Sequence, residues 1–501
     1  MEQIQEEQKN IRSLAEKVRN QITIGKINQE VKHDIDILEN SKDCQTETID
    51  NQFYLLSTLA KYYKSINHYD KAGKYSRDAL RMVNDVADSS IKMVIDTYIE
   101  YAILERDYEQ QSTARIELAK LLAFLDKKEY KDDYAYGLIF SHLGKISFDE
   151  ENPEAGFTQM EKALKYFKAV QPVTNPVVRN TIRFLAGTYI KTENYSKALK
   201  LHEELLKAYE EDENISAGVQ ERMEIGQIYF YIDLKEARRQ MTDTIKFITE
   251  NSSEMEEEIT KATLMLAEID EHMMNFPRAI TYYKRALDDL KKMYNKNHFM
   301  VVYVYSKIGT ISLKINNQKQ AREYLEEGLE LSKDYPKIRL QFLYALGKIY
   351  SSKKEYTKAF DMFTQFMDKL KADGRRISKA YANTLQSIAY NYIEQENYET
   401  AYQYYTEALL IYEKVGNCRE EKGLCSIRLA YCCENTDHNN FEKAERYYEK
   451  GFKLIEQGRN REVIEEALAA IIDYHTRIGN FEKRRKYEDK YVKLVLNQKD
   501  V

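Results

Sequence analysis

A repeat of about 42 residues runs through most of this chain and constrains its fold more than any other feature. In the stretch SIAYNYIEQENYETAYQYYTEAL, the small residue Ala389 precedes a second small residue, Ala401, by 12 positions, and Tyr398 stands three positions before the second. The first small position recurs as Ala60, Ala102, Gly144, Ala186, Gly226, Ala267, Gly309, Gly347, Ala389 and Ala430, and Ile472 extends the series. Self-similarity at one spacing is typical of arrays built from one repeated structural unit.

The spacing inside each repeat predicts two helices. Leu385, Ala389 and Tyr392 lie on one face of a first helix, and Ala401 and Ala408, seven apart, lie on one face of a second. A short polar break separates the two. Two antiparallel helices can approach closely only where one or both side chains at the contact are Ala or Gly. The recurring small residues therefore predict a helix hairpin in each repeat.

Few residues interrupt this pattern, since the 501-residue chain has only 17 glycines and five prolines. We therefore predict an all-α fold, an α-solenoid of about 11 antiparallel helix hairpins. Residues 1–50 are predicted to form an N-terminal helical cap, residues 51–460 the repeat array, and residues 461–501 a degenerate repeat with a capping helix.

The repeat that starts at Ala382 resembles the tetratricopeptide repeat at every characteristic position, which are filled by Leu385, Ile388, Ala389, Tyr392, Tyr398, Ala401, Tyr405 and Ala408. The resemblance covers about residues 50 to 492 and implies a right-handed superhelix whose first helices line the concave face. It also implies that Tyr398 and Tyr405 pack inside their hairpin. The usual proline at the repeat end is mostly missing.

The unit is longer than the usual 34 residues. In this it resembles the arrays of kinesin light chains, of spindle-orientation adaptors and of bacterial peptide-sensing regulators. Kinesin light chains often carry Asn just before the Leu-Ala pair to hold an extended peptide. The corresponding position here holds other residues, which are Glu100, His142, Phe184, Glu224, Met265, Lys307, Ala345, Ser387 and Arg428.

Charge and hydropathy exclude several classes of protein. The formal net charge is −6, with 76 basic and 82 acidic residues interleaved, whereas nucleic-acid binders show a basic excess or stripe. No apolar run is long enough to span a membrane, and the first residues do not resemble a signal peptide. The five cysteines, an odd number, favour a reducing compartment. We expect a cytoplasmic protein. A composition rich in Lys, Asn, Ile and Tyr indicates an AT-rich genome, which fits a protist cytoskeletal or ciliary adaptor among other sources.

The sequence contains no nucleophile, phosphate-binding or metalloprotease motif, so we expect a non-enzyme without catalytic residues or cofactor. One cluster could bind metal, and it consists of Cys418, Cys425, Cys432, Cys433 and His438. Structural zinc sites favour close cysteine pairs separated by two to four residues, and this cluster has none. We interpret the cysteines as small apolar packing residues and expect no metal.

The concave face is the candidate binding surface. The resemblance assigns to it positions 2, 5, 6, 9, 12 and 13 of each repeat, and from the seventh to ninth repeats we select Tyr303, Ser306, Lys307, Thr310, Lys314, Gln341, Tyr344, Lys348, Ser351, Asn383, Gln386, Tyr390 and Glu394. This set is polar, mildly basic and rich in Tyr, which suits an acidic or polar segment of a partner. The alternative is an ordinary solvated face. A second candidate is an acidic patch formed by Asp96, Glu100, Asp107, Glu268 and Glu271.

These features predict a non-catalytic adaptor or scaffold that binds a protein or peptide partner in the groove. We expect no nucleic acid and no membrane insertion, and the protein can belong to a larger complex. Two alternatives stay open at this point. One is a ligand-gated peptide sensor of the bacterial type, which compacts on binding. The other is a structural subunit that is permanently buried in an assembly.

Overall fold

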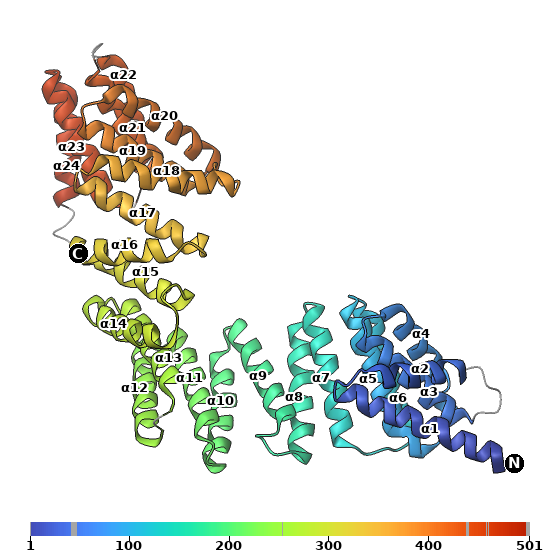
Figure 1. Ribbon diagram of the computed structural model, residues 1–501. Coiled ribbons are helices and arrows are strands. Elements are labelled where there is room, and N and C mark those ends of the chain that lie inside the picture. The colour runs from blue at the N-terminus through green and yellow to red at the C-terminus, as the bar shows by residue number, and fades with distance from the viewer. Residues whose placement is uncertain are drawn as a thin grey trace. The chain divides into compact units, whose positions relative to one another are not determined.

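The computed structural model describes residues 2–41, 48–252, 254–436, 440–456, 458 and 460–496, and within these ranges the regular structure is helical, without a strand (Figure 1). This confirms the all-α prediction. The chain divides into two compact units, Met1–Ser252 and Ser253–Val501, each described separately below. The repeat pattern did not predict this division. The predicted limits of the array and of its two ends stay predictions.

The helices of unit 1 are α1 (Glu2–Thr23), α2 (Gln29–Ser41), α3 (Ile49–Ser65), α4 (Tyr69–Leu80), α5 (Ile91–Asp107), α6 (Gln111–Lys127), α7 (Asp133–Asp149), α8 (Pro153–Val170), α9 (Pro176–Lys191), α10 (Tyr195–Glu211), α11 (Ile215–Ile232) and α12 (Leu234–Asn251), with short 3-10 turns at Val83–Asp85 and Asp88–Ser90. From α3 onward, each odd-numbered helix packs on the helix that follows it, and the pair then packs on the next odd-numbered helix.

The helices of unit 2 are α13 (Glu256–His272), α14 (Phe276–Met293), α15 (Phe299–Lys314), α16 (Gln318–Leu331), α17 (Pro336–Ser352), α18 (Tyr356–Ala372), α19 (Lys379–Glu394), α20 (Tyr398–Val415), α21 (Arg419–Glu434), α22 (Phe441–Ile455), α23 (Arg461–Arg477) and α24 (Phe481–Leu496). The same pairing of odd- and even-numbered helices continues through this unit. We call the odd-numbered helices from α3 onward first helices and their partners second helices.

The small residues of the repeat lie where the two helices of a hairpin meet, as predicted. Ala389 of α19 and Ala401 of α20 are both fully buried. At Gly347 of α17, an added Cβ would lie 2.5 Å from the ring of Phe363 on α18, so the approach leaves no room for a side chain. Tyr405 is buried among these helices, and Tyr398 packs edge-on against Tyr431. The hairpin contact is thus built from small residues flanked by aromatic rings.

The turn inside most hairpins contains one residue in the left-handed region. Between α19 and α20 this residue is Glu396, with φ of 58°. Its N–H donates to the carbonyl of Ile393, and the N–H of Asn397 donates to that of Tyr392, which satisfies two carbonyls at the end of α19. The same conformation recurs at corresponding turn positions, which are Asn67, Glu109, Glu151, Glu193, Met274, Asn316 and Lys354.

The N-terminal helix α1 does not pair with α2 in the manner of the later hairpins. It packs mainly on α3, and its buried face is formed by Ala15, Val18 and Ile22. No helix in the described segments is long and apolar enough to cross a bilayer.

Candidate functional site

One face of the first helix α17 carries a row of polar and aromatic side chains. Lys337, Gln341, Tyr344, Lys348 and Ser351 follow one another at steps of four, three, four and three residues, which places them on one side of the helix. Two pockets open beside this row, both within unit 2. We call this surface the α17 face.

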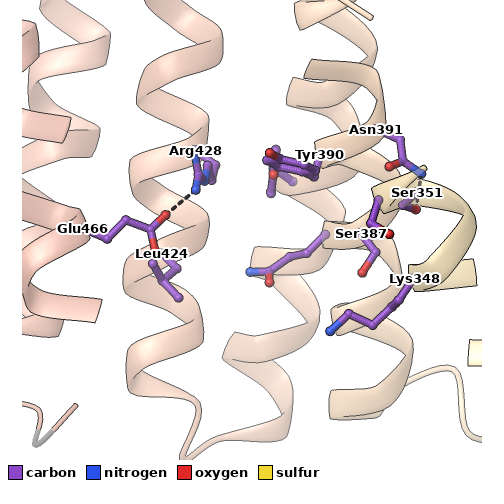
Figure 2. A pocket seen from close by; sticks show the side chains of 11 residues that line it. Lys348, Ser351, Ser387, Tyr390, Asn391, Leu424, Arg428 and Glu466 are labelled. Carbon is purple, nitrogen blue, oxygen red and sulfur yellow. Dashed lines mark hydrogen bonds and ion pairs between the residues drawn. The ribbon is translucent and has the colours of Figure 1, made fainter. Parts of the chain in front are cut away.

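The first pocket has a volume of about 400 Å³. Its lining comes from four first helices and from Tyr405 of α20, and the residues are Lys348, Ser351, Ser352, Gln386, Ser387, Tyr390, Asn391, Tyr405, Leu424, Arg428 and Glu466. Figure 2 shows Lys348, Ser387 and Tyr390 on one side of this space and Leu424 and Arg428 on the other. The volume lies within the range of small-molecule and side-chain binding sites.

The charged groups of the first pocket leave a positive charge. Arg428 forms an ion pair with Glu466, and its guanidinium lies 5.8 Å from the centre of the Tyr390 ring (Figure 2). Lys348 is exposed and has no carboxylate partner among the described residues, and its ammonium lies 5.7 Å from the centre of the Tyr344 ring. Lys348 is therefore the cation of this pocket that is available to an anionic group.

A buried amide adds an unused acceptor to the same pocket. The Nδ2 of Asn391 donates to the Oγ of Ser351 at 2.9 Å (Figure 2). That hydroxyl donates to the carbonyl of Gly347 at 2.9 Å. Because the hydroxyl proton of Ser351 is already used, Ser351 accepts from the amide, which fixes the orientation of Asn391. The Oδ1 of Asn391 then has no hydrogen-bond partner among the described residues, although Asn391 is only 1% exposed. A buried acceptor without a donor is costly.

The second pocket, of about 310 Å³, lies between α17, α18 and α19. Its apolar surface comes from Leu340, Tyr344, Phe366, Leu370 and Ala380, and its polar rim from Lys337, Gln341, Arg375 and Asn383. Lys337 and Arg375 are exposed, and neither side chain has a carboxylate partner in the part of the chain that the structure describes. This pocket can hold an apolar side chain beside a negative charge.

Seven of the residues predicted from the repeat frame line these pockets. Lys348, Ser351, Gln386 and Tyr390 line the first, and Gln341, Tyr344 and Asn383 line the second. Burial raises the pKa of the Tyr344 and Tyr390 hydroxyls, which therefore stay neutral hydrogen-bonding groups at neutral pH. The role of these residues in binding a partner stays a prediction.

The other six predicted residues lie outside both pockets. On α15, the hydroxyl of Tyr303 donates to Glu268 at 2.8 Å, and Lys307 pairs with Glu271 at 3.0 Å. Lys314 also pairs with Glu271, at 3.4 Å. The remaining three also have partners within unit 2. Ser306 donates to Gln341 of α17, Thr310 donates to the backbone of its own helix, and Glu394 pairs with Lys354.

The acidic patch proposed as the second candidate is divided between the two units and is largely neutralised. Glu268 and Glu271 belong to unit 2 and accept hydrogen bonds from α15, as described above. Burial disfavours the charged form of Glu271, but the hydrogen bond and charge of Lys307 overcome this effect and hold its pKa below the usual value. In unit 1, Asp96 and Glu100 lie beside Arg19 of α1, and Asp107 is exposed at the end of α5.

The repeat frame contained a signal for several pocket residues that the sequence prediction missed. Leu424 and Arg428 occupy positions 2 and 6 of the tenth repeat, and Glu466 occupies position 2 of the eleventh. Ser387 occupies position 6 of the ninth repeat. The selection stopped at the ninth repeat and left out position 6 of that repeat, although the same rule predicts all four residues. Asn391 lies outside the six inner positions and had no such signal.

The cysteine cluster is buried. Cys418, Cys425, Cys432 and Cys433 are all inaccessible and carry free thiols. The thiol of Cys425 donates to the carbonyl of Tyr405, and burial raises its pKa to about 12. A thiol in this environment packs as a small apolar group. His438 lies outside the described residues.

Comparison with known proteins identifies the repeat. Models of the tetratricopeptide repeat match residues 181–216, 259–334 and 382–415. This repeat is generally a protein-interaction module and not an enzyme. No curated protein matches the chain.

Several solved structures are similar to parts of the chain. The apo form of RapI shares 14% identity and a TM-score of 0.43, over 81% of this chain and 98% of that one. A putative kinesin light chain from Podosopora anserina with nearly identical TPR-like repeats shares 13% identity and a TM-score of 0.34, over 40% and 97%. MamA shares 17% identity and a TM-score of 0.31, over 40% and 92%. We draw no functional conclusion from similarities of this size.

The three matched segments lie on α9–α11, α13–α16 and α19–α20, where the structure contains the helix hairpins and buried small residues that the repeat pattern requires. The chain is therefore a tetratricopeptide repeat protein.

Proposed function

We propose that this protein is a non-catalytic scaffold that binds an acidic segment of a partner protein on the α17 face of unit 2. The observation that carries the proposal is the combination of two adjoining pockets with three unpaired cations. These cations are Lys337, Arg375 and Lys348, and none has a carboxylate partner among the described residues. Unpaired cations beside apolar surface favour a ligand that combines carboxylates with an apolar side chain.

The geometry favours an extended segment over a compact ligand. The two pockets lie along one helix, and residues of α17 and α19 contribute to both. In an extended chain, alternate side chains point in the same direction, so neighbouring pockets can each receive one. The cytoskeletal or ciliary setting that composition favours stays a prediction.

The test is a selection of binding peptides from a library of random 12-residue sequences on the full-length protein. We expect enriched peptides to carry Asp or Glu on either side of an apolar residue. The Lys337→Glu and Lys348→Glu variants should each weaken binding by tenfold or more, because each places a like charge beside the ligand.

Lys414→Glu is the matched control. Lys414 is exposed on the second helix α20 and, like Lys348, has no ion-pair partner among the described residues. The Lys414→Glu substitution makes the same charge change away from both pockets and should alter peptide binding less than twofold. Equal losses for Lys348→Glu and Lys414→Glu would show a general charge effect and contradict the proposal, and so would enrichment of basic peptides.

A further inference from the structure

The N-terminal helix α1 occupies the first-helix face of unit 1. The hydroxyl of Tyr54 on α3 accepts a hydrogen bond from Arg12 at 3.2 Å, and the Arg12 guanidinium lies 4.3 Å from the centre of the Tyr54 ring. Further along α1, Arg19 donates to the backbone carbonyl of Ser57 on α3 at 3.4 Å. Tyr54 and Ser57 are positions 2 and 5 of the first repeat, the same frame positions that line the pockets of unit 2.

The contact of Arg19 extends to the second repeat. Its guanidinium lies 3.3 Å from Glu100 and 3.6 Å from Asp96, both on α5, and the Arg19 residue is only 6% exposed. Glu100 also pairs with Lys61 of α3 at 3.1 Å. Asp96 and Glu100 are positions 2 and 6 of the second repeat. Asp96 and Glu100, which belong to the predicted acidic patch, thus bind the guanidinium of Arg19 from α1.

The rest of the interface is an apolar stripe on α1. Ala15 and Val18 are fully buried and Ile22 nearly so, while Ile11 and Leu14 pack at the edge of the same cluster. Positions 11, 15, 18 and 22 follow the spacing of one helix face. Two features of α1 therefore match the face of α3 and α5. One is the apolar stripe, and the other is Arg19, which directly follows Val18 of that stripe.

We propose that the first-helix face of α3 and α5 is a docking site for an amphipathic helix that carries an arginine, and that α1 is its occupant in cis. A partner helix with the same apolar stripe and arginine competes with α1 for this face. The inference concerns unit 1 and is independent of the acidic segment proposed for unit 2. Two observations distinguish α1 from a helix of the array. It packs more on α3 than on α2, and it covers inner positions of two successive repeats.

The test uses the full-length protein and a fluorescent synthetic peptide of the 22 residues of α1. A double variant, Val18→Asp with Arg19→Ala, loosens α1 because it introduces a charge into the apolar stripe and removes the guanidinium. We expect the peptide to bind this variant at least tenfold more tightly than the wild type, in which α1 blocks the face. A peptide with Arg19→Ala should bind the variant at least tenfold less tightly than the wild-type peptide does.

A control and a second measurement make each outcome decisive. Lys32→Ala removes an exposed charge on α2, and its affinity for the peptide should be as low as that of the wild type. Hydrogen exchange of the double variant should show loss of protection in α1 with α3 to α6 still protected. Loss of protection in α3 to α6 would show that α1 is an integral part of the core and would overturn the proposal. Loss of protection in α1 of the double variant, without binding of the peptide, would overturn the proposal as well.

Discussion

Replacing Gly451 by alanine tests whether the approach of the two helices sets the hairpin geometry. Gly451 of α22 faces Gly423 of α21, and a Cβ at position 451 would lie 2.7 Å from the carbonyl oxygen of Gly423 and 3.2 Å from the backbone nitrogen of Ile427. Both of these atoms belong to the backbone, and the Cγ1 of Ile427 would also lie 2.8 Å away, so side-chain rotation alone does not relieve the contact. The helices must separate, and the buried side chains between them lose contacts.

The expected magnitude follows from two opposing effects. Alanine gains about 1 kcal/mol over glycine in a helix interior. Overpacking a close contact costs about 1–3 kcal/mol, and we expect the upper half of that range because the backbone itself is in the way. Gly451→Ala should therefore destabilise the α21–α22 hairpin by about 1–2 kcal/mol, which is the difference between the two effects.

Gly187→Ala is the matched control. Gly187 lies inside α9, and a Cβ there would meet no atom of another element within 4 Å. This substitution should gain the full helix propensity and stabilise its hairpin by about 1 kcal/mol. Native-state hydrogen exchange measures both effects, because it reports the local opening free energy of each hairpin in an array that need not unfold in one step. A Gly451→Ala variant as stable as the wild type would contradict the close backbone approach of α21 and α22.

Three further predictions concern single residues. Glu396→Gly should raise the opening free energy of the α19–α20 turn by about 1 kcal/mol, because glycine adopts the left-handed conformation without strain; a loss of stability would contradict this. In unit 1, hydrogen bonds from His202 and Arg183 outweigh the burial of Glu221 and hold its pKa below the usual value, so its stabilising effect is present at neutral pH and is lost as the pH falls through that lowered pKa. The melting temperature of Glu221→Gln should lie below that of the wild type at pH 7 and the gap should shrink on acidification, whereas a gap that does not depend on pH would contradict this. Finally, the buried thiol of Cys425, whose pKa is raised to about 12, should react with a thiol reagent only after unfolding, as mass spectrometry of its peptide can show; rapid labelling of the native protein would contradict the packing role.

The hairpins were predictable from the sequence because the residues that fix them are local and periodic. Ala389 and Ala401 recur at a fixed separation, and the structure buries both at the contact between α19 and α20. The conformation of the turns was less predictable from the sequence. Glycine is the usual residue in a left-handed turn, but here Glu396, Met274 and Lys354 adopt that conformation, so the composition of the turn carries no signal.

The candidate site was predictable only in part. The inner positions of the frame give Tyr344, Lys348 and Tyr390, which line the pockets. The repeat frame did not predict two kinds of contact. Phe366 and Tyr405 reach the pockets from second helices, and the contact of Arg19 with α5 joins residues about 80 positions apart without any local pattern.

The most direct test of the proposed binding surface is site-specific photo-crosslinking. The photoreactive residue p-benzoylphenylalanine replaces either Tyr390, which lines the first pocket, or Leu410, which is 53% exposed on the second helix α20. Each protein is then irradiated with the acidic peptide obtained by selection on the wild type. We predict a crosslink from position 390 and none from position 410. A crosslink from position 410 alone would place the ligand on the second helices and contradict the account.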